Sequence, residues 1–299
     1  MRAYLGGLSW RELGKRLWRD QARDELLGRA GELAYFFLLA LFPMLLFLVA
    51  LIGMALGSGS ALRANLFASL QDLMPESALA IVRHVVDETA AASGGGKAFL
   101  GLLLALWSAS AGMSAVMRAL CHVHQVAETR SFWRSRGIAI ALTVGVGALM
   151  LVAVASTVLG DPIARAIGSA IGAGSALVMV WNLARWPAAI LLVITGYALI
   201  YRYGPDRRDR DRRRLLSPGA IVGAALWLAA SVGFRVYVSH FGNYSATYGS
   251  LGAVILLMLW FYLTGLALLV GAEVDAEVES AQPSAGERRR RTAPMRRAA

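Results

Sequence analysis

Three ionisable residues, Glu32, Arg118 and Glu273, each stand at one end of a long apolar stretch. An ionisable side chain at the edge of a membrane's hydrocarbon is a functional candidate, and opposite charges at one depth are natural partners. We therefore expect these residues to form a charge cluster that closes one side of a helical bundle. The alternative is that each side chain reaches water separately, with its apolar stem along the membrane.

Arg185 stands inside another apolar stretch, about 25 Å by helical rise from the basic end of its predicted helix. A guanidinium at this depth suits an anionic group such as a phosphate or a carboxylate. We predict that it lines a polar cavity open to the outer side of the membrane. The residues grouped with it in this cavity are Asn182, Arg235, Asn243, Tyr244 and Tyr248. In the alternative interpretation, Arg185 and the flanking Trp181 and Trp186 anchor the helix at the membrane surface.

The sequence offers few groups for catalysis or metal binding. Cys121 is the only cysteine, which excludes an intramolecular disulfide and a site of several thiolates. A regular helix points His122 and His124 about 200° apart, so they cannot share one ion. Phosphodiester hydrolysis usually needs clustered carboxylates with metal ions, or a positioned base. The acids here alternate with arginines or are spread along helices. We therefore predict no catalytic residue, no metal and no cofactor.

The elements that must position these residues are membrane-spanning helices. Of the 299 residues, 57% are hydrophobic and 16% are charged, against about 25% charged in soluble domains. Stretches of about 20 apolar residues match the ~30 Å thickness of the hydrocarbon. The sequence therefore predicts an all-α integral membrane protein, a bundle of six transmembrane helices. The predicted spans are residues 32–56, 97–120, 137–159, 176–201, 217–239 and 250–273.

Three segments lie outside the predicted spans of the membrane domain at 31–280. Residues 1–30 place tryptophan and leucine on one helical face among basic residues, which predicts an interfacial helix. A solvated helix that leads into the first span is the alternative. Residues 58–96 carry apolar residues at helical spacing on both sides of a proline, which predicts amphipathic helices on the outer face. Residues 281–299 are expected to be a basic, disordered tail.

The distribution of lysine and arginine predicts the orientation of the bundle. The N-terminal segment, the 127–136 connection, the 202–214 loop and the C-terminal tail hold 23 of the 30 basic residues. This bias places these segments, both termini and the Glu32 cluster on the cytoplasmic side. The 202–214 loop is therefore a topological marker, and we predict no nucleic-acid partner. Its arginines are expected to contact anionic lipid headgroups. They are Arg207, Arg208, Arg210, Arg212, Arg213 and Arg214.

Five sequence blocks fall in one order along the chain and carry a resemblance. They are "AGELAYFFLLALFPMLL" (30–46), "LWSASAGMSAVMRAL" (106–120), "RWP" (185–187), "SPGAIVGAALW" (217–227) and "YGSLGAVILLMLWFYLTGLALLVGAEV" (248–274). Over roughly residues 25–280 the chain resembles the YihY/BrkB family of bacterial inner-membrane proteins. The resemblance implies a six-helix bundle in the inner membrane. Family members once carried the label ribonuclease BN, and lipid or solute transport is the usual proposal for them.

Two positions depart from the family pattern. Ala111 stands where a larger, often charged residue is expected, and Asp275 stands where an asparagine is expected.

Two classes of function remain open. The first is a transporter or flippase-like carrier of a lipid or an anionic amphipathic solute, with the bilayer and its anionic headgroups as partner. Pro43 and Pro187 lie inside the first and fourth spans, in halves of opposite orientation, a pattern found in transporter cores. The second is a non-transporting scaffold that maintains the cell envelope. We do not expect ribonuclease activity, and no feature of the sequence sets the oligomeric state.

Overall fold

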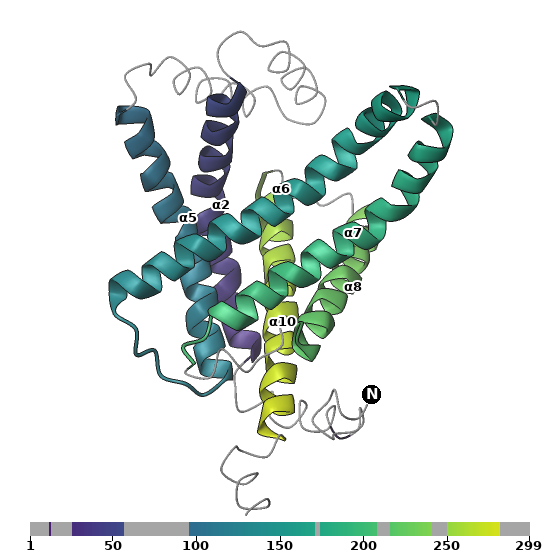
Figure 1. Cartoon of the computed structure of the whole chain (residues 1–299). Helices are drawn as coiled ribbons and strands as arrows, with labels where there is room; N and C mark the ends of the chain where they lie inside the picture. The colour runs from purple at the N-terminus through teal and green to yellow at the C-terminus, as the bar shows by residue number, and fades with distance from the viewer. Residues whose placement is uncertain are drawn as a thin grey trace, which may run out of the picture.

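A computed structural model describes residues 26–56, 96–170, 174–207, 216–240 and 250–281, together with Glu12. These residues form six α-helices and their connections (Figure 1). Each helix contains a segment long and apolar enough to cross a membrane, which confirms the all-α, six-span prediction. The helices are α2 (Leu26–Leu56), α5 (Gly96–Val123), α6 (Phe132–Ala170), α7 (Gly174–Tyr203), α8 (Pro218–His240) and α10 (Ser250–Ser280). The surface helix predicted in 1–30, the amphipathic region at 58–96 and the tail lie almost wholly outside the described residues.

The helices α6 and α7 form a long antiparallel hairpin. Helix α6 ends at Ala170 and α7 begins at Gly174, on either side of a glycine-rich stretch. With 39 residues, α6 is about 58 Å long, which exceeds the ~30 Å of hydrocarbon. A helix of this length must tilt or project from the bilayer, and Figure 1 shows α6 crossing α5 and α2 obliquely. Pro43 and Pro187 both lie within continuous helices.

The connection from α7 to α8 is fixed locally at both ends. At the end of α7, the backbone amide of Gly204 donates to the Ile200 carbonyl at 2.8 Å. A side chain at Gly204 would meet that carbonyl oxygen at 2.5 Å, so only glycine fits. At the start of α8, the Ala220 amide donates to the Ser217 hydroxyl at 3.1 Å. Serine before proline is a favoured helix start.

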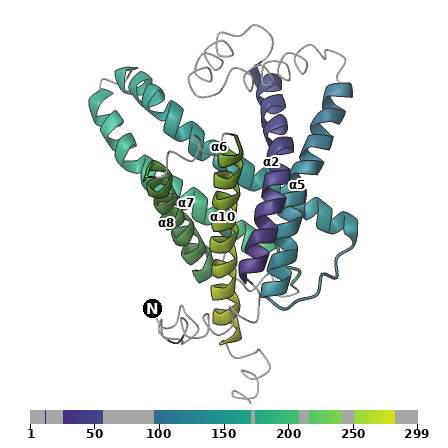
Figure 2. The ribbon, with the colours of Figure 1, turned by 180° about the vertical axis from the view of Figure 1, so that it is seen from behind.

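The bundle is packed at one end and open at the other. Helix α10 lies between α2 and α8, α2 also packs against α5, and the α6–α7 hairpin crosses this row (Figures 1 and 2). We call the end that holds the start of α2, the ends of α5, α7 and α10 and the start of α8 the packed end. In the opposite half, the α6–α7 hairpin leans away from α2 and α5 in both views. We call this half the splayed half.

The burial of apolar side chains follows the same division. The largest buried cluster draws on α2, α5, α7, α8 and α10, each close to the packed end. Its members include Leu33, Leu120, Ala198, Ala224 and Leu269. Large apolar side chains of the splayed half are exposed, and they include Phe42, Leu45, Leu100, Leu104, Met179, Leu183 and Val236. The described helices therefore share their largest buried cluster at one end of the bundle. Large apolar side chains are exposed in both halves, among them Leu27, Tyr35 and Leu216 near the packed end.

Glycine and tyrosine produce the closest helix contact at the packed end. A side chain at Gly219 or Gly271 would collide with the backbone of the opposite helix, so α8 and α10 touch almost backbone to backbone. The Tyr201 hydroxyl from α7 fills the remaining space and donates to the Leu268 carbonyl at 2.6 Å. A side chain at Gly223 would meet that hydroxyl at 2.7 Å and the Tyr197 ring at 2.9 Å. Small residues at such interfaces are how membrane helices approach closely.

Gly223→Ala tests this contact against a control on the same helix. The added methyl must push the Tyr197 and Tyr201 rings outward, and overpacking of this kind costs about 1–3 kcal/mol. Gly233→Ala meets nothing within 4 Å, so it is expected to leave stability unchanged or raised by up to ~1 kcal/mol. Thermal melting of the purified variants in detergent measures the difference. Equal melting temperatures for the two variants would contradict the close contact.

Candidate functional site

A tight turn after α5 sets the position of the loop at 124–131. Gln125 has a positive φ of 52°, which is uncommon for a residue with a side chain. The Val126 amide donates to the Cys121 carbonyl at 2.9 Å and the Gln125 amide to the His122 carbonyl at 2.8 Å. This pair of bonds is the Schellman helix end, here with glutamine in the left-handed position. The turn directs the following residues, Glu128, Thr129 and Arg130, toward the end of α7.

These residues bind the end of α7 through an ionic network. Arg130 donates from Nε to one Glu128 carboxylate oxygen at 2.5 Å and from one Nη atom to the other at 2.6 Å. The same guanidinium donates to the Gly204 carbonyl at 2.7 Å and lies 3.6 Å from the Asp206 carboxylate. Thr129 donates to Asp206 from its amide at 2.8 Å and from its hydroxyl at 2.5 Å. We call Glu128, Thr129, Arg130 and Asp206 the latch.

Within the latch the arginine side chain is shielded from water, whereas Glu128 and Thr129 are exposed. The Arg130 side chain is 2% exposed. Burial acts to lower the pKa of its guanidinium, whereas the hydrogen bond and charge of Glu128 and the charge of Asp206 raise it, and the net direction is upward. The arginine therefore keeps its charge in the closed latch. The single cysteine, Cys121, lies beneath it, with its sulfur 3.4 Å from the Asp206 amide and 3.5 Å from a Glu128 oxygen.

Two further contacts tie α10 to the packed end. Arg207 pairs with Glu279 at 2.6 Å, which joins the end of α7 to the last turn of α10. The Asp275 carboxylate, 5% exposed, accepts from the Gly219 amide at 2.6 Å. A carboxylate is favoured there because the first turn of a helix carries free amides and a partial positive charge. An asparagine side-chain oxygen would accept the same hydrogen bond from the Gly219 amide. Asp275 in place of the asparagine expected for the family is therefore compatible with capping the start of α8.

The residues predicted as a charge cluster have different surroundings. Glu273 is 3% exposed, whereas Glu32 and Arg118 are exposed. The Arg118 guanidinium lies 5.3 Å from the centre of the Phe36 ring. Within the described part of the chain, no ion pair joins Arg118 to either glutamate. A shared cluster of these three residues stays a prediction.

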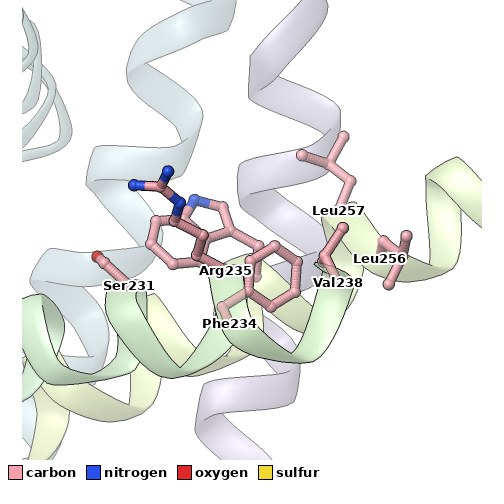
Figure 3. A pocket seen from close by; sticks show the side chains of 7 residues that line it. Ser231, Phe234, Arg235, Val238, Leu256 and Leu257 are labelled. Carbon is pink, nitrogen blue, oxygen red and sulfur yellow. The ribbon is translucent and has the colours of Figure 1, made fainter. Parts of the chain in front are cut away.

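Of the residues predicted to form an outer cavity, Arg185, Asn182 and Arg235 are described, and a shared cavity stays a prediction. The Arg185 guanidinium lies 5.8 Å from the centre of the exposed Trp186 ring, an arrangement typical of a surface anchor. Asn182 is half-buried on the same helix. Arg235 instead lines a groove between α8 and α10, which neither Arg185 nor Asn182 lines (Figure 3). Asn243, Tyr244 and Tyr248 lie outside the described residues, as do the arginines of the 202–214 loop from Arg208 to Arg214.

Sequence reasoning missed the latch. The sequence shows Asp206 only as one of the acids that alternate with arginines, whereas in the structure its carboxylate accepts from Thr129 and lies near Arg130. The sequence feature that could have revealed it is Gly204-Pro205. This pair ends α7 and leaves Asp206 beside the short loop after α5. Among the described residues, no group of three or more His, Cys, Asp or Glu side chains is placed to hold a metal ion.

Comparison with known proteins identifies relatives over most of the chain. The sequence model of the family described as Virulence factor BrkB matches residues 17–296. "Putative ribonuclease-like protein YfkH" of Bacillus subtilis is 36% identical over 88% of this chain and 93% of its own length. A protein of Tolumonas auensis named "UPF0761 membrane protein" is 27% identical over 87% of this chain and 82% of its own. A protein of that name from Alkalilimnicola ehrlichii is 29% identical over 86% of this chain and 56% of its own length. No solved structure matches the chain.

Arg130→Gln tests whether the latch closes the packed end. The change leaves the Glu128 and Asp206 carboxylates without their shared cation. We expect a loss of stability between the ~1 kcal/mol of exposed ion pairs and the ~3–5 kcal/mol of buried ones. Cys121, 5% exposed in the closed latch, should react several-fold faster with a water-soluble maleimide in the purified variant.

The matched control is Arg134→Gln, because Arg134 is an exposed residue near the start of α6. It should change neither the melting temperature nor the labelling rate, and Cys121→Ser should abolish labelling. The latch would be discounted if Arg130→Gln labelled no faster than Arg134→Gln.

Proposed function

The chain belongs to the Virulence factor BrkB family of multi-pass membrane proteins, and on that premise we propose that it is a flippase-like carrier. Its cargo is a lipid or another anionic amphipathic molecule. The observation that carries the proposal is the division of the bundle into a packed end and a splayed half. A carrier must expose its site to one side of the membrane at a time, and a bundle closed at one end only has the form of one such state.

The packed end provides a closure that is able to open. The latch and the Arg207–Glu279 pair are polar contacts between helix ends, and such contacts exchange for water when the ends separate. The glycine contact of α8 with α10 is different, because it fixes two backbones against each other. It is suited to serve as the fixed point about which the other helices rock, as rigid bodies do in alternating access.

The charge distribution supports a proposed orientation of the two ends in the membrane. Basic residues of the described chain gather at the packed end, where Arg130, Arg134, Arg202 and Arg207 lie. By the positive-inside rule this end faces the cytoplasm, with both termini on that side of a bacterial inner membrane. The splayed half then faces outward. The loop arginines from Arg208 to Arg214 would hold anionic headgroups at the inner surface, each contributing about 1 kcal/mol. Arg207, also predicted to contact headgroups, is instead paired with Glu279.

The packed end must open if the chain moves lipid, and Asp206→Cys tests this. The Asp206 amide lies 3.4 Å from the Cys121 sulfur, so the new thiol is expected to pair with the single native cysteine. The oxidised protein is then locked closed. In liposomes containing a fluorescent phosphatidylglycerol, we expect lipid movement between leaflets to stop on oxidation and to return on reduction. Chemical reduction of the outer-leaflet dye measures the movement.

Asp206→Ser is the control, since it removes the same carboxylate and provides no thiol. Its lipid movement should not respond to oxidation. If Asp206→Cys forms the disulfide quantitatively and still moves lipid at an undiminished rate, opening of the packed end is not part of transport. If the folded wild-type chain moves no lipid at all, the scaffold function takes the place of the carrier.

A further inference from the structure

A groove runs between α8 and α10 in the splayed half. It has a volume of about 460 Å³, within the range of roughly 300–1,000 Å³ typical of small-molecule sites. From α8 it is lined by Ser231, Phe234, Arg235 and Val238, and from α10 by Leu256, Leu257 and Trp260 (Figure 3). The four α8 residues follow the i, i+3, i+4, i+7 spacing of one helix face. They extend over about 10 Å along the axis.

Aromatic rings make the floor of this groove firm and apolar. The Trp260 ring lies 5.2 Å from that of Phe234 and 5.9 Å from that of Trp227, centre to centre. The Trp227 indole nitrogen donates to the Thr264 hydroxyl at 3.3 Å, which fixes its orientation. Phe234 continues the row to Tyr237, whose ring is stacked on it at 6.5 Å. A hydrocarbon chain laid along this row would exchange contact with bulk lipid for contact with a preformed surface.

Arg235 is the one charged group in the lining of the groove. It lies five residues before the last residue of α8, about 7–8 Å along the axis, which is close to the outer membrane surface in the proposed orientation. No hydrogen bond or ion pair joins its guanidinium to another residue anywhere in the described ranges. The Arg235 side chain is exposed, and a guanidinium this near a helix end reaches the headgroup level, where lipid phosphates lie. Figure 3 shows it standing clear of the helix beside the aromatic rings.

We propose that this groove binds an anionic phospholipid of the outer leaflet, with its phosphate on Arg235 and one acyl chain over Phe234 and Trp260. If the protein is a carrier, the ligand of this groove is its cargo. That assignment of cargo rests on the proposed function, whereas the binding site itself does not. Charge complementarity selects the ligand. The apolar floor accepts any acyl chain, and the guanidinium prefers a headgroup with net negative charge, because such a headgroup carries no cation of its own to compete for the phosphate.

A photo-crosslinking experiment on the full-length protein tests the site. The protein is placed in lipid nanodiscs that contain phosphatidylglycerol or phosphatidylcholine, each with a diazirine on one acyl chain. After illumination, mass spectrometry identifies the labelled peptides. We expect labelling of the peptides that contain Phe234 and Trp260, about fivefold stronger with phosphatidylglycerol, as one arginine–headgroup attraction would give. Arg235→Gln should remove that preference.

The control variant is again Arg134→Gln, an exposed arginine in α6 away from the groove, which should keep the preference. Arg235→Lys retains the positive charge and should keep part of the preference for phosphatidylglycerol. Three results would overturn the site: equal labelling by the two lipids, an unchanged preference in Arg235→Gln, or no label in α8 and α10. Loss of labelling on addition of soluble glycerol phosphate would also overturn it, because the headgroup alone would then be the ligand.

The crosslinking result and the transport result fail separately. Specific labelling without lipid movement would leave a structural lipid site and remove the carrier function. Lipid movement without specific labelling would leave the carrier and remove this groove as its binding site.

Discussion

The contact between Gly219 and Gly271 is the constraint on which the remaining structure depends. Within a bilayer, burial of apolar side chains gives helices no advantage over contact with lipid tails, so association depends on close packing and on hydrogen bonds between helices. Here glycine removes the side chains from both surfaces, and Tyr201 seals the contact through its bond to the Leu268 carbonyl. Three helices, α7, α8 and α10, are thereby joined at one end of the bundle.

The position of that contact explains why polar contacts between helix ends gather around it. Asp275 reaches the free amides at the start of α8 only because the two backbones touch there. The latch and the Arg207–Glu279 pair add ties between the ends of α5, α7 and α10. Beyond these ties the helices diverge, and their exposed apolar side chains meet lipid or cargo. The groove with Arg235 lies in this diverging part.

The six helices were predictable because charge-free stretches of membrane length leave few alternatives, and the Ser217-Pro218 start of α8 was readable as a helix signal. The sequence also contains the Gly219-x-x-x-Gly223 pair, but the same spacing recurs elsewhere in this glycine-rich chain, so spacing alone could not select it. The latch could not be predicted, because Glu128 and Asp206 are distant in sequence and meet only through the turn at Gln125 and the stop at Gly204. Likewise, the row of Trp227, Trp260 and Phe234 depends on how α8 and α10 are rotated against each other.

In the proposed carrier, the packed end and the splayed half open and close in alternation. Spin labels at Leu45 on α2 and Leu183 on α7, both exposed in the splayed half, measure its opening when placed in a Cys121→Ser background. Pulsed electron paramagnetic resonance in nanodiscs gives the distribution of distances between them. We expect that replacing phosphatidylcholine with phosphatidylglycerol adds a population at shorter distance, because bound anionic lipid favours closure of this half. A single distance, the same in both lipids, would contradict it.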